Sequence, residues 1–230
     1  MNQYDSIAQY YEELMGDKGD LPNQHLLDPI LLDLLPKEKD RIVLDFGCGS
    51  GRWTKVLAAK YQSVKGIDKA QEMLQIAKRM RAADNITYTA ADLENELPFP
   101  DESFDLEFAN MVVHYVADLE GMAKELYRVA KPGCTLMFST HHPTFDLARY
   151  EFLSNATTRT EFTTTGSLKG KVSLERFYEP WEQLIAHFTT AGFHLRTQQD
   201  AIITAEFAKI YPRYQQYVGL PRFTVLQFTK

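Results

Sequence analysis

Three glycines separated by single residues occupy positions 47–51 of this chain, in the order Gly-Cys-Gly-Ser-Gly. Glycine is needed where the backbone takes a positive φ or lies close to a ligand, because it has no Cβ. The glycines follow a compact apolar run at 41–46 and precede helical spacing at 53–60. In an open α/β sheet, such a turn at the carboxyl end of the first strand is a ligand-binding position. The segment predicts a small-molecule site, with a tight loop that binds no ligand as the alternative.

Aspartates stand at the ends of three successive expected strands: Asp45, Asp68 and Asp92. Asp68 comes 17 positions after Gly51, where a carboxylate can accept hydrogen bonds from both hydroxyls of a ribose. Helix capping is the alternative for Asp68, because a helical segment follows it. Capping alone does not readily explain all three acids, so we expect them to surround one nucleoside-like ligand.

The spacing of the glycines distinguishes dinucleotide cofactors from cofactors without a pyrophosphate, which bind to the same type of sheet. The dinucleotide fingerprint G-x-G-x-x-G would place its third glycine at Arg52, whereas here it falls one position earlier, at Gly51. This spacing suits a cofactor that has no pyrophosphate to place on the helix N-terminus. Asp45 would repel a pyrophosphate and could favour an α-amino cation. The spacing and Asp45 thus disfavour NAD, and an NAD-dependent oxidoreductase is kept as the alternative function.

Histidines near the ends of the fourth and fifth expected strands are the candidates for acid–base chemistry. His114 is the candidate general base, because an imidazole ordinarily titrates near neutrality, with packing in the pocket wall as its alternative role. His141 and His142 are neighbours in extended chain, so they point in opposite directions and at most one faces the pocket. We take His142 and Tyr178 as candidate substrate contacts. No further ligands at suitable spacing accompany the histidines, so no metal site is expected.

Strands and helices alternate over the first 140 residues. Apolar runs predict strands, and helical periodicity predicts the segments between them, after two N-terminal helices at 5–15 and 23–35. Such alternation indicates parallel βαβ units with right-handed crossovers. The expected strands are 41–46, 63–67, 86–90, 104–109 and 135–139, and the expected helices are 53–60, 72–82 and 119–129.

The rhythm changes after residue 139. Residues 141–172 are polar and rich in threonine and suggest a hairpin near 166–170. A helix follows at 179–191, and strands at 193–197 and 223–228 predict an antiparallel pair. The expected fold is α/β: a Rossmann-like, doubly wound, mostly parallel seven-stranded sheet with an antiparallel C-terminal strand and a helical or irregular lid. We expect one domain over 1–230, with a helical cap (1–36), a cofactor-binding core (41–139), a lid insertion (140–178) and a C-terminal helix and strand pair (179–230).

Aromatic residues are concentrated in the C-terminal part of the chain. They could form the wall of an apolar pocket under the lid, or equally a satellite core beneath it. These residues are Tyr178, Trp181, Tyr211, Tyr214, Tyr217 and Phe223.

Several motifs together resemble the class I S-adenosylmethionine-dependent methyltransferases. The likeness is to the small-molecule branch that includes the ubiquinone- and menaquinone-biosynthesis enzymes, with a type 11-like methyltransferase domain. The resemblance covers roughly residues 4–139, and a weaker similarity continues toward the C-terminus. The motifs are VLDFGCGSG at 43–51, VKGID at 64–68, AADL at 90–93, LPFPDESFD at 97–105 and KPG at 131–133.

This resemblance implies S-adenosyl-L-methionine as the cofactor and assigns a role to each matching position. The glycine turn would lie against the methionine and ribose, Asp68 would hold the ribose and Met73 would pack on the adenine. The segment after the fourth strand would contact the methionyl group, and the N-terminal helix would close over the cofactor. The implied cofactor-binding residues are Tyr11, Asp45, Gly47, Cys48, Gly49, Asp68, Lys69, Met73, Asp92, Leu93, Asn110 and Met111.

The reaction implied by the resemblance is transfer of a methyl group to a small-molecule acceptor by in-line displacement. Alignment of the reactants can contribute roughly 7–11 kcal/mol, and a base is needed only where the acceptor must lose a proton. A non-catalytic S-adenosylmethionine-binding protein is an alternative, and it would lack an acceptor pocket. A protein or RNA methyltransferase would need a peptide groove or a basic face. The motifs do not identify the acceptor or the methylated atom.

Composition limits the partners. The chain has 230 residues, with 25 Lys and Arg against 31 Asp and Glu, which gives a net charge of −6. Such a surface repels phosphate backbones, so no nucleic-acid partner is expected. No apolar run approaches the roughly 18–20 residues of a membrane span, and the first residues do not read as a signal or transit peptide. We therefore expect a cytoplasmic protein. The sequence does not determine its oligomeric state, and a homodimer is one option.

Overall fold

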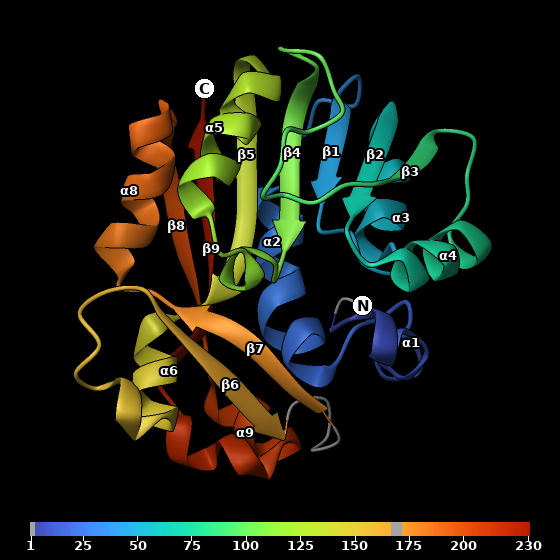
Figure 1. Ribbon diagram of the computed structural model, residues 1–230. Coiled ribbons are helices and arrows are strands. Elements are labelled where there is room, and N and C mark those ends of the chain that lie inside the picture. The colour runs from blue at the N-terminus through green and yellow to red at the C-terminus, as the bar shows by residue number, and fades with distance from the viewer. Residues whose placement is uncertain (1–2, 167–171) are drawn as a thin grey trace.

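A seven-stranded sheet forms the centre of the computed structural model, which describes residues 3–166 and 172–230 (Figure 1). The strand order is β3-β2-β1-β4-β5-β9-β8. Strands β1 to β5 are parallel, and β9 runs antiparallel to both β5 and β8, which confirms the predicted fold class. The strands are β1 (Ile42–Phe46), β2 (Ser63–Asp68), β3 (Ile86–Ala90), β4 (Phe104–Asn110), β5 (Ala130–His141), β8 (His194–Ile202) and β9 (Pro221–Thr229).

Helices cover both faces of this sheet. Alternate residues of a strand point to opposite faces, and in β1 both Val43 and Leu44 are fully buried because each face is covered. Leu44 packs in one core with α5 (Leu119–Val129) and α8 (Trp181–Ala191). Val43 packs in a second core with α2 (Asp28–Leu34) and α3 (Arg52–Ala58). The buried strands thereby fix the position of the turns that follow them.

The N-terminal segment is more divided than the sequence predicted. The first expected helix consists of a 3₁₀ turn, η1 (Asp5–Ile7), and α1 (Ala8–Met15), and the second of a π-helix, η2 (Asn23–Leu27), and α2. Ala8 packs with Met73 of α4 (Gln71–Met80), so α1 lies against the helix that follows β2. In Figure 1, α1 lies below the arrowheads of β1 and β2, at the carboxyl ends of the parallel strands.

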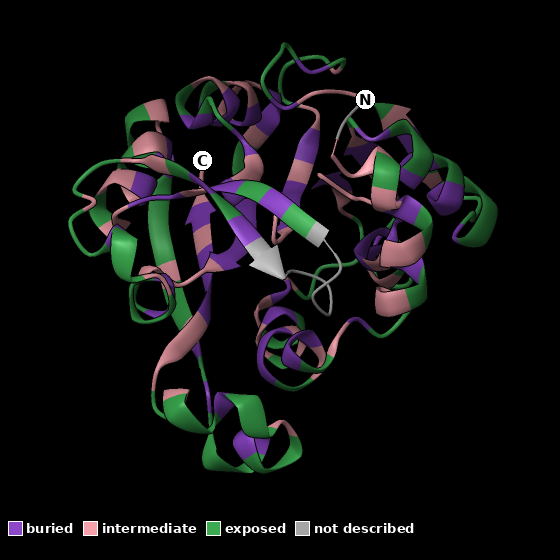
Figure 2. Cartoon of the chain, turned by 60° about the horizontal axis from the view of Figure 1, so that its bottom comes forward, coloured by how far each residue is buried: buried purple, intermediate pink, exposed green. Residues whose placement is uncertain are grey.

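The segment after β5 adds a second layer at the same end of the sheet (Figure 1). It comprises α6 (Pro143–Arg149), the 3₁₀ turn η4 (Glu151–Leu153) and the antiparallel pair β6 (Thr160–Gly166) and β7 (Val172–Tyr178). This pair confirms the expected hairpin, although most of the predicted turn lies outside the described residues. Figure 2, in which this end comes forward, shows the hairpin crossing in front of the buried strands.

Three short helices and a longer fifth strand were not predicted. The helices are η3 (Val113–Tyr115), α9 (Ala205–Ile210) and η5 (Pro212–Tyr217), the last two in the stretch between β8 and β9 that was expected to be irregular. Strand β5 extends to His141 because it pairs with β9 as far as Phe223. Tertiary pairing, rather than the local sequence pattern, sets its length.

Candidate active site

The glycine turn after β1 combines tight packing with open space. Gly47, Gly49 and Gly51 have φ values of 67°, 54° and 84°, in the left-handed region that favours glycine. A Cβ on Gly47 would lie 2.5 Å from Val112, and one on Gly51 would lie 2.5 Å from the hydroxyl of Tyr88. A Cβ on Gly49 would meet no atom within 4 Å. The outer two glycines therefore serve packing, whereas Gly49 faces a space that a ligand can enter.

Asp68, at the end of β2, fixes the shape of this turn. Its carboxylate accepts one hydrogen bond from the N–H of Gly49 and another from the N–H of Ala70, each at 2.8 Å. Burial raises the pKa of Asp68, and the two N–H groups act in the opposite direction. The bond to Ala70 is a local turn ahead of α4, whose N-cap is Ala70 without a side-chain cap, so Asp68 does not cap this helix, and the bond to Gly49 spans two strand ends. The carboxylate thus both holds the glycine turn and lines the cavity beside it.

Asp45 lies beneath the turn, only 2% exposed. Its Oδ2 accepts a hydrogen bond of 2.5 Å from the hydroxyl of Thr54. Burial raises the pKa of Asp45 to about 7, with a smaller contribution from the charge of Asp68, while Thr54 and Arg52 oppose the shift. The ionisation of Asp45 is consequently poised near neutral pH.

A cavity of about 110 Å³ opens in front of the turn, and a narrow adjoining pocket shares four of its lining residues. The cavity brings together ten predicted cofactor-binding residues: Tyr11, Gly47, Gly49, Asp68, Lys69, Met73, Asp92, Leu93, Asn110 and Met111. The other two, Asp45 and Cys48, line the adjoining pocket. Residues from five separate segments thus surround one space. At its rim, the Lys69 ammonium lies 3.8 Å from the Asp92 carboxylate.

The end of β4 is held in an uncommon backbone conformation. Met111 has a φ of 62°, which is rare for a residue with a side chain. Its N–H donates to the carbonyl and hydroxyl oxygens of Ser139, both at 3.1 Å, and the Ser139 hydroxyl donates to Oδ1 of Asn110 at 2.8 Å. Strain of this kind concentrates at functional sites. Here it directs Asn110 and Met111 into the cavity.

A larger cavity of about 400 Å³ adjoins the first. Its wall comes from α1, η3, the end of β5, α6, the β6–β7 hairpin, η5 and the start of β9. Five residues line both cavities and mark where they meet: Tyr4, Tyr11, Asn110, Met111 and Tyr115. The sequence did not single out Tyr4 or Tyr115 as cofactor contacts, although the first lies at the start of the region that resembles the methyltransferases and the second follows His114.

His114 lines the larger cavity, and its imidazole is buried. Its Nδ1 lies 3.1 Å from the hydroxyl of Thr140, and its Nε2 has no hydrogen-bond partner among the described residues. The ring of His141 is 4.7 Å away, between centroids. Burial, together with nearby arginines, lowers the pKa of both histidines well below the ordinary value. Both imidazoles are therefore neutral at neutral pH.

The structure does not bring His142 and Tyr178 to the larger cavity, which corrects the predicted substrate contacts. His142 stacks on Trp181, and its Nε2 lies 3.7 Å from Asp200. Because neighbours in extended chain point in opposite directions, it is His141 that faces the cavity. Tyr178 lines only a narrow space of about 20 Å³. Of the six aromatic residues singled out in the sequence, three line the larger cavity: Tyr211, Tyr214 and Phe223.

A buried ion pair ties the N-terminal helix to the site, and sequence reasoning missed it. The guanidinium of Arg81 binds the carboxylate of Glu12 in bidentate fashion, at 2.6 and 3.0 Å. It also bonds to Asp17 and donates to the carbonyl oxygen of Ser50 at 2.8 Å. One side chain thereby connects α1, α4 and the glycine turn. The partners are far apart in the sequence, so no local pattern indicates the pair.

Comparison with known proteins gives a family match over the core. Residues 44–138 match a family described as "Methyltransferase domain". Curated relatives include the malonyl-[acyl-carrier protein] O-methyltransferases of Serratia marcescens, 37% identical over 98 residues, and of Salmonella typhimurium, 38% identical over 117 residues. These matches cover 43% and 51% of this chain. The chain spans only 37% and 45% of the length of those relatives.

Solved structures match over most of the chain. An S-adenosylmethionine-dependent methyltransferase from Mesorhizobium loti superposes with a TM-score of 0.72 at 20% identity, covering 94% of this chain and all of that one. A putative S-adenosylmethionine-dependent methyltransferase from Listeria monocytogenes superposes with a TM-score of 0.73 at 21% identity, covering 88% of this chain and 95% of that one. Among the described residues, no helix is both long and apolar enough to cross a membrane. Residues 44–138 of this chain are therefore similar to a methyltransferase domain, and the chain has the fold of the solved S-adenosylmethionine-dependent methyltransferases.

Proposed function

We propose that this chain is an S-adenosylmethionine-dependent methyltransferase acting on a small-molecule acceptor bound in the larger cavity. The observation that carries the proposal is the junction of the two cavities. The smaller one contains the motif residues of the methyltransferase resemblance, and the larger one has room for a second reactant. A protein that only bound the cofactor would not need the second space. The net charge of −6 favours a small acceptor over a nucleic acid.

The residues of the smaller cavity fit an adenosyl sulfonium. Gly49 leaves open the space that a Cβ would fill, and Asp68 offers carboxylate oxygens next to it. Met73 and Leu93 are buried apolar residues that can pack on an adenine, with Asp92 at the same edge. We assign the α-amino group to the side of Asp45, since an ionised carboxylate there attracts a cation.

The bound cofactor supplies a methyl group on an already activated sulfonium. The protein then has to align the acceptor and exclude water. Three tyrosines stand where the cavities meet, with the ring of Tyr4 packed edge-on against Tyr11 and Tyr115 at 6.0 and 5.4 Å between centroids. We assign to this cluster the closing of the site and the orientation of the acceptor.

His114 is the residue we propose as general base for an acceptor that must lose a proton. Its lowered pKa keeps the ring neutral, and its Nε2 is free to accept a proton. His141 beside it is neutral as well, so the positive charges that oppose protonation of His114 are those of Arg176 and Arg159. The role is limited to acceptors that are not already ionised. The cytoplasmic location stays a prediction from the sequence, which does not determine the oligomeric state.

Calorimetry with S-adenosylmethionine, S-adenosylhomocysteine and NAD tests the cofactor assignment. We expect micromolar binding of the two methionine-derived ligands and none of NAD. Binding of NAD without either of the other two would replace the proposal with the oxidoreductase alternative. A metabolite extract incubated with methyl-labelled cofactor tests the reaction itself. Cofactor binding with no labelled product in any extract would indicate a binding protein instead.

A further inference from the structure

The larger cavity has a positively charged wall within an acidic protein. Four arginines line it, Arg149, Arg176, Arg213 and Arg222, and among its described lining residues the only carboxylates are Asp20 and Asp146. The chain as a whole carries a net charge of −6, so this concentration of guanidinium groups is local to the cavity.

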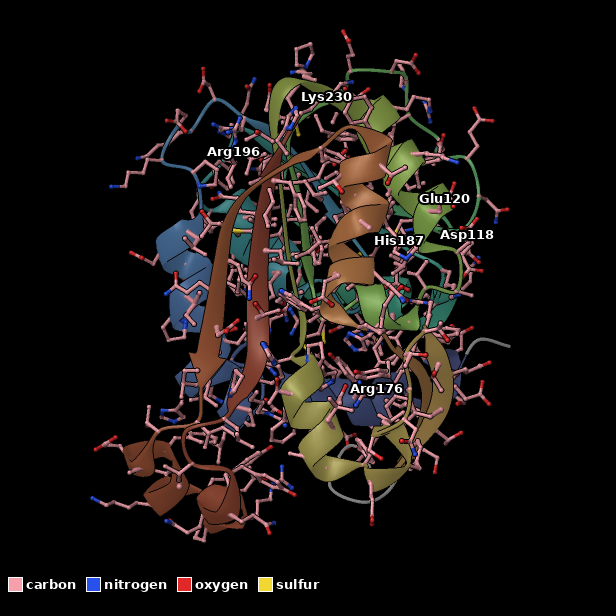
Figure 3. All side chains as sticks on the ribbon, turned by 90° about the vertical axis from the view of Figure 1, so that its left-hand side faces the viewer. Asp118, Glu120, Arg176, His187, Arg196 and Lys230 are labelled. Carbon is pink, nitrogen blue, oxygen red and sulfur yellow. The ribbon has the colours of Figure 1, made fainter. Side chains whose placement is uncertain are left out.

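One of the four arginines is already neutralised. Arg176 forms a bidentate pair with Asp146, at 2.6 and 2.7 Å, and both side chains are buried. In Figure 3, Arg176 lies below the sheet, between α6 and the β6–β7 hairpin. Asp20 is engaged too, since it accepts hydrogen bonds from the backbone and side-chain N–H groups of Asn23 at 2.9 and 2.7 Å. The other three arginines of this wall, Arg149, Arg213 and Arg222, have no carboxylate within 4.0 Å in the part of the chain that the structure describes.

Arg222 is the most confined of these. Its guanidinium lies over the rings of Phe145, Tyr214 and Phe223, at 4.6 to 5.0 Å from their centroids, and its Nε is buried without a hydrogen-bond partner. Burial lowers its pKa, as do the charges of Arg149 and Arg213, while Tyr214 and Asp20 oppose the shift. The group nevertheless stays charged, because an arginine is not deprotonated in proteins. A desolvated cation without an anion is costly, and a bound anion would remove that cost.

Unpartnered polar atoms are concentrated in the same wall. Of the eleven buried side-chain N and O atoms without a partner among the described residues, five belong to residues that line this cavity. Two of these groups are donors with no acceptor, the Nε–H of Arg222 and the hydroxyl of Tyr214. Buried donors without acceptors in a native structure call for a ligand or water. Donors beside guanidinium groups select an anion.

We infer that this wall binds an anionic group of the methyl acceptor, a carboxylate or a phosphate, with Arg222 and Tyr214 as the central contacts. The inference rests on the proposed function, since it describes the acceptor of the same site. The aromatic rings around Arg222 indicate that the anion is attached to an apolar or aromatic body. None of the arginines lines the smaller cavity, so the anion anchors the acceptor and another part of the molecule faces the tyrosine junction.

Three probes that share a phenyl ring test this assignment: phenylacetate, phenyl phosphate and the uncharged phenylacetamide. Each is titrated calorimetrically into protein saturated with S-adenosylhomocysteine. We expect the better anion to bind about tenfold more tightly than the amide, which corresponds to about 1.4 kcal/mol. The stronger of the two anions identifies the head group. Equal affinity for anions and amide, or no anion binding at millimolar concentration, would overturn the inference.

Variants separate the anion site from general damage. Arg222→Gln should remove the preference for the anion and leave amide binding unchanged, and Tyr214→Phe should reduce it less, because it removes one donor and keeps the ring. The matched control is Arg196→Gln on β8, an arginine that donates to the Thr229 hydroxyl at the opposite end of the sheet from Arg176 (Figure 3). Loss of the preference in Arg196→Gln would count against the assignment. Failure of wild type to bind S-adenosylhomocysteine while phenylacetate binds would refute the proposed function and leave the anion site standing.

Discussion

At the scale of single residues, Asp68 has two functions that a substitution can separate. Its carboxylate holds the N–H of Gly49 in place and lines the smaller cavity. Asp68→Ala should weaken the binding of S-adenosylhomocysteine at least tenfold, or about 1.4 kcal/mol, as measured by calorimetry. Asp33→Ala, at an exposed position of α2, is the control and should bind as wild type does. Unchanged affinity in Asp68→Ala would show that the carboxylate serves only the turn.

Asp45 predicts a pH dependence of both stability and binding. Its pKa rises from 3.8 to about 7 on folding, so the free protein loses stability as pH increases through this range, by up to about 4 kcal/mol. Asp45→Asn should remove that loss, so its gain in stability over wild type should be larger at about pH 8 than at about pH 5 in thermal unfolding.

The affinity for the ligand should depend on pH in the opposite direction to the stability of the free protein. The ionised carboxylate of Asp45 attracts the α-amino cation, so the affinity of wild type for S-adenosylhomocysteine should increase from about pH 6 to about pH 8. Calorimetry at the two pH values measures this, and the Asn variant should show no such increase. An affinity of wild type that is independent of pH would place the α-amino group away from Asp45.

His114 predicts a specific loss of turnover. If it is the general base, His114→Phe should lower kcat by about 10²–10⁴-fold and leave cofactor affinity unchanged, in the labelled-methyl assay. The control is His194→Gln, an exposed histidine at the start of β8. Full activity of His114→Phe would assign the histidine to the cavity wall alone.

At the scale of elements, the buried ion pair between Glu12 of α1 and Arg81, the residue after α4, holds α1 against the site. Removing one partner of a buried pair leaves the other charge uncompensated, so Arg81→Met should lower the free energy of unfolding by about 3–5 kcal/mol. It should also weaken cofactor binding, because α1 carries Tyr11 of the cavity wall. Chemical denaturation measures the first effect and calorimetry the second.

A matched variant on α5 tests whether burial is the cause. Lys124→Met breaks the exposed pair with Glu120 (2.6 Å), which lies on the α5 face shown in Figure 3. Exposed pairs contribute less than about 1 kcal/mol, so stability and cofactor affinity should both change little. If Lys124→Met lost as much stability and cofactor affinity as Arg81→Met, burial of the Arg81–Glu12 pair would not be the cause.

At the scale of the whole molecule, cofactor binding should stabilise the fold. Glycine turn, strand ends and N-terminal helix come together only in the native state, so the ligand binds the folded chain alone. At a hundredfold excess over its Kd, S-adenosylhomocysteine should stabilise the protein by about 2.7 kcal/mol. For a chain of this size the expected increase in Tm is about 5–10 °C. NAD should leave Tm unchanged, and an equal increase with NAD would refute the cofactor assignment.

The sequence by itself determined the sheet and brought the predicted cofactor-binding residues to one cavity and the pocket that adjoins it. Each strand and helix of the core follows from a local period, and strands with the same direction end at the same edge of the sheet. Glycines and acids at those ends therefore had to meet, which is why Gly49 and Asp68 could be placed together. The bond between them at 2.8 Å is a consequence of this topology.

The larger cavity was decided by the tertiary structure. Its wall draws Arg149, Arg176 and Arg222 from α6, β7 and β9, segments whose approach no local pattern encodes. The choice of His141 over His142 likewise depended on how far β5 pairs with β9, because a strand's register decides which neighbour faces inward. Periodicity is a local property and was readable from the sequence, whereas the charge and shape of the cavity arise from contacts between distant residues.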